Sequence, residues 1–149
     1  MDLQVRLARP GDFDAVLALY AQLHPDNGAT PRERSRTVFE HILSQPHLEL
    51  IVAQAGDAVI GTCYLNIIAN LSRAASPYGV LENVVVDQRI RGQGIGQAIV
   101  AFALARARQA GCYKVMLQTG SRRESTHGFY RSCGFSADDK FAFVARPVR

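Results

Sequence analysis

The sequence predicts an α/β protein of the α+β kind, with a mixed and mostly antiparallel sheet and helices on both of its faces. Segments in which apolar and polar residues alternate, as in strands, are interleaved with segments whose apolar residues recur every three or four positions, as in helices. Their order is strand, two helices, three strands, helix, strand, helix and strand. Consecutive strands favour antiparallel pairing, and the strand–helix–strand unit over residues 80–118 favours a parallel pair.

The first three elements have clear boundaries in the sequence. Residues 3–7 alternate apolar and polar, which is typical of a strand with one buried face. Asp12 is expected to cap the N-terminus of the helix that follows it. Thr30 and Glu33 have the spacing of a capping box and predict a second helix, which ends at about residue 44.

The remaining elements follow from periodicity and from glycine punctuation. Gly111 and Gly134 are expected to end helices, because glycine readily adopts the left-handed backbone found just beyond a helix. The expected elements are strands at 48–54, 59–70, 80–86, 112–118 and 140–146, helices at 94–110 and 124–133, and an irregular loop at 71–79.

The composition excludes several classes of protein. The chain has 149 residues, which suits one domain over residues 1–149, and its hydrophobic content of 48% is too high for a disordered chain. No apolar run approaches the ~20 residues of a membrane span, and the N-terminus lacks a signal-peptide pattern, so we expect a cytoplasmic protein without a membrane partner. The net charge of +4 comes without a dense basic stripe, so no nucleic-acid partner is expected.

The cysteines and histidines give no sign of a metal site or a disulfide framework. Cys63, Cys112 and Cys133 are odd in number and widely spaced, and no Cys-x-x-Cys occurs. The 4 histidines lack the spacing of metal ligands. We therefore expect no metal and three reduced thiols.

The glycine-rich segment 91–96, between an apolar strand and a helix, is the most informative part of the chain. Its glycines remove side chains that would keep a ligand from the backbone, and the helix that it opens has N–H groups without intrahelical partners. Such a helix end favours an anion, above all a phosphate. The spacing fits neither a P-loop, since Gln97 follows the last glycine, nor the Gly-x-Gly-x-x-Gly of dinucleotide sites.

The segment Arg91-Gly92-Gln93-Gly94-Ile95-Gly96 resembles the pyrophosphate loop of the GNAT superfamily of acetyl-CoA-dependent N-acetyltransferases, whose pattern is Gln/Arg-x-x-Gly-x-Gly/Ala. The preceding apolar strand, the following helix, Phe129-Tyr130 and Cys133-Gly134-Phe135 also match, so the resemblance covers nearly the whole chain. It implies the GNAT fold, acetyl-CoA or coenzyme A as cofactor, and acetyl transfer to an amine. Because many members form homodimers, the resemblance leaves a homodimer open.

The resemblance also implies which residues hold the cofactor. Main-chain groups of the motif strand would pair with the pantetheine arm, and the loop and first helical turn would hold the pyrophosphate. These residues are Val84, Val85, Val86, Arg91, Gly92, Gln93, Gly94, Ile95, Gly96 and Gln97. Many members carry Asn-x-x-Ala before Phe-Tyr, where this chain has Arg123 and Thr126. Arg123 either contacts a phosphate in place of that asparagine or is a surface charge.

Two residues are candidates for the chemistry. Glu82 is the candidate base: packing does not explain a carboxylate in so apolar a strand, and family members carry an acid there that deprotonates the amine, directly or through water. It is expected to share a sheet face with Val84, two residues on, and Asn83 to lie on the opposite face. Tyr130 matches the family's tyrosine that protonates the departing sulfur.

The cofactor half of the chain is similar to glucosamine-phosphate N-acetyltransferases, in Leu81–Val86, in Gly111–Val115 and in Phe129–Phe135. Acceptor groups are expected from residues 24–36 and 70–79, where Arg32, Arg34, Arg36 and Arg73 can meet an anionic acceptor. We expect a small-molecule amine as the substrate. The alternatives are a protein amine, at a lysine or an N-terminus, and a coenzyme A sensor without turnover, although a sensor needs neither Glu82 nor Tyr130.

Overall fold

The computed structural model describes residues 1–26, 28 and 30–147. By its contacts the chain divides into two units, Met1–Leu117 and Gln118–Arg149. The first unit contains β1 (Leu3–Leu7), α1 (Phe13–Leu23), α2 (Arg32–Ser44), β2 (Leu48–Ala55), β3 (Ala58–Ile68), α3 (Ser72–Ala75), β4 (Tyr78–Val86), α4 (Ile95–Gln109) and β5 (Val115–Leu117), with 3-10 turns at Pro10–Asp12 and Gln88–Ile90. The second unit contains α5 (Glu124–Ser132).

The five strands form one sheet in the order β1-β2-β3-β4-β5. The pairs β1–β2, β2–β3 and β3–β4 are antiparallel, and β5 runs parallel to β4. Helix α4 connects β4 to β5, which is the connection that a parallel pair requires. The predicted fold class is therefore confirmed.

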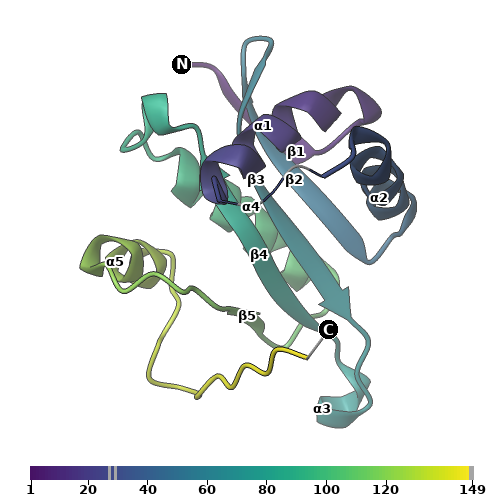
Figure 1. Ribbon diagram of the computed structural model, residues 1–149. Helices are drawn as coiled ribbons and strands as arrows, with labels where there is room; N and C mark the ends of the chain where they lie inside the picture. The colour runs from purple at the N-terminus through teal and green to yellow at the C-terminus, as the bar shows by residue number, and fades with distance from the viewer. Residues whose placement is uncertain (27, 29, 148–149) are drawn as a thin grey trace. The chain divides into compact units, whose positions relative to one another are not determined.

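Helices cover both faces of the sheet (Figure 1). On one face, Phe13 and Val16 of α1 and Phe39 of α2 pack with Leu50 and Val52 of β2. On the other face lies α4, whose Ile99 comes so close to Gly61 of β3 that a Cβ at that glycine would lie 2.6 Å from the isoleucine Cδ1. Glycine at position 61 thus lets the helix approach the sheet.

The sequence misplaced two helix caps. Asp12 does not cap α1; its carboxylate accepts a hydrogen bond from the Arg9 N–H (2.7 Å) and pairs with Arg6 (2.7 Å), so it closes the 3-10 turn before the helix. The residue preceding α2 is Pro31, with no side-chain cap, so the predicted capping box at Thr30 does not form. Helices α1 and α2 nevertheless form, because their apolar faces are packed against the sheet.

The final predicted strand, at 140–146, is also wrong. These residues have no regular structure, and Phe141 and Phe143 are each 94% exposed. Alternation alone does not make a strand, since a strand needs a partner for its N–H and C=O groups. The described residues of the unit Gln118–Arg149 include no second strand to supply one.

None of the helices in the described part of the chain has the length and apolar content needed to span a membrane.

Candidate active site

Strand β4 is paired on both sides only over its first half. Its register with β5 runs from Gly79 to Leu81 in the described residues, whereas its register with β3 continues to Val86. The Asp87 N–H donates to the Ile60 carbonyl of β3 (2.9 Å), so by alternation the main-chain groups of Val86 are directed away from β3. The second half of β4 therefore presents main-chain hydrogen-bonding groups on a strand edge that β5 leaves open.

A β-bulge at Asn83 separates the two halves of β4. Glu82 lies opposite Tyr64 and Val85 lies opposite Thr62, so β4 has one residue more than β3 between these pairs. Asn83 has a φ of +53°, in the left-handed region that asparagine tolerates better than most residues. Its side chain lies near the Tyr20 hydroxyl of α1 and acts on the pKa of that phenol. Burial of that phenol raises the pKa of Tyr20 to about 12, so it stays protonated at neutral pH.

The bulge overturns the predicted orientation of Glu82. Residues paired across strands share a face, so Glu82 shares the face of Tyr64 and Thr62 with Val85, and not with Val84 as strict alternation predicts. Asn83, which was expected to point away, lies near Tyr20 of α1, the helix that covers this same face. The sequence signal for the bulge was an asparagine inside a valine-rich strand, a residue type depleted in strands.

Glu82 is exposed, although most of its neighbours along the strand are apolar. It lies in a row across three strands on the α1/α2 face, in which Leu50 is opposite Tyr64 and Tyr64 is opposite Glu82. Tyr64 packs against the apolar cluster of this face. The carboxylate thus sits where that apolar cluster gives way to open surface, accessible to a solute or to water.

The turn after β4 is held by a buried carboxylate that the sequence analysis missed. Asp87 accepts from the Arg89 N–H (3.0 Å) and pairs with the Arg89 guanidinium (2.6 Å). Gln22 of α1 accepts from the Gln88 N–H (2.9 Å), which joins this turn to the helix. Hydrogen bonds from Arg89 lower the pKa of Asp87 to about 2. This network fixes the position from which the glycine-rich loop departs.

The glycine-rich loop has the backbone that an anion site requires. Gly92 and Gly94 have φ of +81° and +78°, and nothing lies within 4 Å of a Cβ built on either residue. Arg91 is exposed and donates from Nε to the Val86 carbonyl (3.2 Å). The segment Arg91–Gly94 and Gln97 are exposed, whereas Ile95 and Gly96 are buried in the first turn of α4.

These features fit a pyrophosphate. The first N–H groups of the 15-residue helix α4 have no intrahelical acceptor, and the helix dipole adds partial positive charge at that end. The open space above both glycines lets phosphate oxygens approach the main chain, and Arg91 adds a full charge. Ten of the predicted cofactor residues, from Val84 to Gln97, therefore lie on one continuous strand–loop–helix segment.

The other predicted site residues belong to the unit Gln118–Arg149. Tyr130, in α5, is half-buried, and its ring lies between Phe129 (centroids 5.0 Å apart) and Phe135 (6.2 Å). Arg123 is exposed and immediately precedes α5. The Thr126 hydroxyl accepts a hydrogen bond from the Ser121 hydroxyl (3.1 Å), which holds the approach to the helix.

The predicted acceptor segments are described in part. Residues 27 and 29 lie outside the described residues. Arg73, predicted in a loop, has a left-handed backbone in α3, and its guanidinium lies 5.7 Å from the centre of the Tyr113 ring. On α2, Arg32 pairs with Asp14 (2.5 Å) and Arg36 lies over the Phe13 ring (4.4 Å).

Comparison with known proteins identifies the architecture. The model of the acetyltransferase (GNAT) family matches residues 13–135. The chain is 33% identical to glucosamine 6-phosphate N-acetyltransferase 1 of Oryza sativa subsp. japonica over 80% of this chain and 72% of that protein. It is 30% identical to an aminoalkylphosphonate N-acetyltransferase of Salmonella typhimurium, over 89% of this chain and 84% of that protein. The solved structure of a putative acetyltransferase from Agrobacterium tumefaciens str. C58 has a TM-score of 0.91 and 40% identity, and covers 97% of this chain and 99% of that one.

Proposed function

Because the chain belongs to the GNAT acetyltransferase family, we propose that it transfers the acetyl group of acetyl-CoA directly to the primary amine of a small molecule. The observation that carries this proposal is the continuity of the open edge of β4 with the glycine-rich loop and the N-terminus of α4. A ligand with an extended chain that ends in a pyrophosphate can pair with the open edge of β4 through its chain. Its pyrophosphate can then bind at the glycine-rich loop and the N-terminus of α4. We take residues 1–149 to act as one domain, since the family match spans residues 13–135.

The small-molecule acceptor is supported by the relatives. The relatives from Oryza sativa and Salmonella typhimurium are named for amine substrates that carry a phosphate and a phosphonate, respectively. Exposed arginines on α2 suit an anionic acceptor on the same face of the sheet as Glu82. A protein amine would need a longer groove, and the test below includes a lysine peptide.

We assign the following roles to the chain's own groups. Acetyl-CoA supplies a thioester whose carbonyl the amine attacks. The exposed Glu82 carboxylate accepts the proton of the acceptor ammonium, directly or through a water. A backbone N–H beside the bulge, at Val84, donates to the carbonyl oxygen as negative charge grows there, because alternation directs the Val85 N–H towards β3. Tyr130 donates its phenolic proton to the departing sulfur, with Arg123 and Thr126 on the same helix segment as cofactor contacts.

The experiment is thiol release from acetyl-CoA with a panel of amines: glucosamine 6-phosphate, an aminoalkylphosphonate, a polyamine, an aminoglycoside and a lysine peptide. We expect acceptor-dependent release. Tyr130→Phe should lower kcat by about 10²–10⁴-fold, the usual contribution of a general acid, with little change in acetyl-CoA affinity. Glu82→Gln should lower kcat at neutral pH and shift activity to higher pH, where the free amine is abundant.

The matched control for these two variants is Glu40→Gln, which removes an exposed carboxylate from α2 and should leave release unchanged. Failure of acetyl-CoA to bind would contradict the assignment of the loop. Binding without release for any amine would favour the coenzyme A sensor.

The loop has its own test. Gly94→Ala places a side chain at a φ of +78°, which strains the backbone by about 1–2 kcal/mol and puts a methyl group where phosphate oxygens would approach. We expect coenzyme A affinity to fall about tenfold or more. Gly11→Ala is the matched control, because nothing lies near its Cβ position and its φ is not positive. Equal affinities for the two variants would show that no ligand approaches Gly94.

A further inference from the structure

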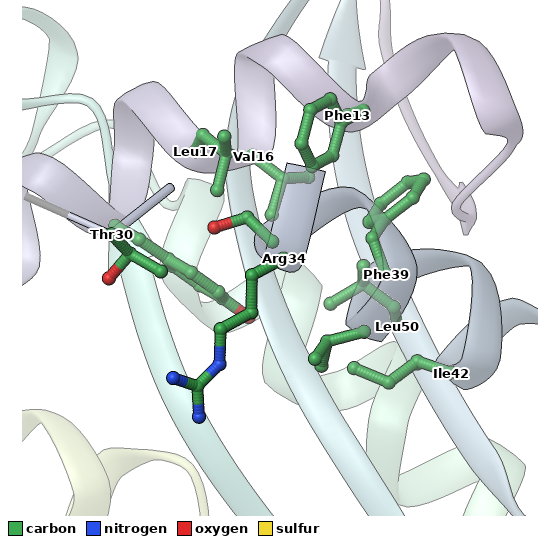
Figure 2. A pocket seen from close by; sticks show the side chains of 11 residues that line it. Phe13, Val16, Leu17, Thr30, Arg34, Phe39, Ile42 and Leu50 are labelled. Carbon is green, nitrogen blue, oxygen red and sulfur yellow. The ribbon is translucent and has the colours of Figure 1, made fainter. Parts of the chain in front are cut away.

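A cavity of about 230 Å³ lies between α1 and α2, over the sheet (Figure 2). Its walls are mainly aliphatic and aromatic, with Leu17 of α1, Val38 and Ile42 of α2 and Leu50 of β2 among them. Thr30, Arg34 and Ser35 supply its polar edge. Small-molecule sites typically measure 300–1,000 Å³, so this cavity suits one apolar group of a ligand rather than a whole substrate.

The cavity is joined to the candidate active site by two tyrosines. Tyr20 lines the cavity, and its hydroxyl lies near the side chain of Asn83 in the bulge. Leu50, in the cavity wall, begins the row Leu50–Tyr64–Glu82 across the sheet. Because adjacent strands lie about 4.8 Å apart, the cavity wall and Glu82 are separated by about 10 Å. A small molecule can therefore occupy the cavity and bring another of its groups to Glu82.

The charge at the edge of the cavity favours an anion. Figure 2 shows the Arg34 guanidinium directed away from the apolar side chains. Within the described residues Arg34 forms no ion pair, whereas Arg32 pairs with Asp14 and Arg36 lies over the Phe13 ring. Tyr64 lies between Leu50 and Glu82 in this row, and the face of an aromatic ring attracts an ammonium group. A ligand's anionic group can therefore bind Arg34, its apolar group can occupy the cavity, and its ammonium group can lie beside Tyr64 and Glu82.

We propose that this cavity binds the apolar group of the acceptor, which is an amine with a short aliphatic or aromatic group and a carboxylate or phosphate that Arg34 binds. This inference rests on the proposed function and narrows its substrate class. It separates this chain from relatives named for glucosamine 6-phosphate, since a polyhydroxylated sugar would leave its hydroxyls without partners against apolar walls.

The test compares phenylalanine, 2-phenylethylamine and glucosamine 6-phosphate as acceptors. Phenylalanine and 2-phenylethylamine differ only in the carboxylate. We expect phenylalanine to have the highest kcat/KM, about tenfold or more above that of glucosamine 6-phosphate, because its phenyl group is buried against the apolar walls. Arg34→Gln should raise KM for phenylalanine about tenfold and leave that for 2-phenylethylamine unchanged.

Filling the cavity provides the second arm. Ser35→Trp and Val38→Trp each place a large ring at its edge and should raise KM for both phenyl amines about tenfold, with acetyl-CoA affinity unchanged. Glu40→Trp adds the same ring at an exposed position of α2 outside the cavity and should change neither. Melting temperatures establish that each variant is folded, and two independent filling variants guard against a local effect of one.

The outcomes separate the inference from the proposed function. A higher kcat/KM for glucosamine 6-phosphate, or an unchanged KM for the phenyl amines in both filled variants, overturns the inference while acetyl transfer stands. Calorimetry with the coenzyme A-bound protein covers the case of no transfer to any amine. Binding of phenylalanine that Ser35→Trp abolishes then supports the cavity although the proposed reaction fails, and no binding overturns it.

Discussion

The two faces of the sheet are covered in different ways. Against one face, α4 buries Ile99, Val100 and Ala103 without any exposed surface, and Gly61 lets the helix approach closely. Near the end of this helix, Arg106 forms an ion pair with Glu49 (2.5 Å). Against the other face, α1 and α2 leave the cavity uncovered, and Tyr64 and Glu82 extend beyond the apolar cluster.

This difference indicates that the α4 face mainly stabilises the fold and that the α1/α2 face offers space for a ligand. A closely packed face gains the most from apolar burial and has no room for a ligand. A partly covered face gives up some of that stabilisation and offers a concave surface beside the bulge of β4. Substitutions on the α4 face should therefore change stability, and those on the α1/α2 face should change activity.

The largest expected effect is on the α4 face. Ile99→Ala should lower the free energy of unfolding by about 2–5 kcal/mol, because Ile99 is fully buried and its removal leaves a cavity. Urea unfolding measures this loss, and acetyl-CoA affinity well below the melting temperature should stay unchanged. Val38→Ala on the other face, where Val38 is 53% exposed, should change stability by less than about 0.5 kcal/mol. Equal losses would remove the distinction between the faces.

An intermediate effect is expected at the bulge, where a substitution should change both the free energy of unfolding and kcat. Asn83→Ala should lower the free energy of unfolding by about 1–2 kcal/mol, since alanine disfavours a φ of +53°. Asn83→Gly should keep the bulge at a smaller loss and retain more of kcat. Tyr20→Phe removes only the hydroxyl, and should lower kcat more than it changes acetyl-CoA affinity. If Asn83→Ala and Asn83→Gly have the same kcat, the backbone of the bulge has no part in the reaction.

The smallest effect is the pH dependence of the network that joins α1 to the turn after β4. The pKa of Asp87 is lowered to about 2 from its ordinary value of about 3.9, so folding favours its ionised form. The stabilisation is therefore present above about pH 4 and is lost as the pH falls towards 2. The stability difference between the wild type and Asp87→Asn should shrink over this range in acid-unfolding experiments.

Arg89→Gln tests the cause of this pH dependence, since the arginine is the principal partner of Asp87. It should flatten the same part of the profile. A wild-type slope in both variants would contradict the role given to the pair.

The accuracy of the sequence-based predictions differs from one element of the chain to another. The periodicity of α1, α2 and α4 was enough to place them, and the parallel pairing of β4 with β5 followed from the helix between them. The alternation at 140–146 was equally regular and yet formed no strand, because pairing depends on a neighbour that local pattern does not reveal. Asp12 and Thr30 failed as caps because each end of a helix has several ways to satisfy its N–H groups.

By itself the sequence determined the fold class and indicated the glycine-rich loop as a candidate anion site, because periodicity and glycine spacing are local properties. Only the tertiary structure decided the face on which Glu82 lies, the left-handed Asn83 and the cavity beside Tyr20. These depend on the register between β3 and β4 and on how α1 and α2 pack over the sheet. One extra residue in a strand reverses the faces that alternation predicts beyond it, and only its cross-strand partners reveal that residue.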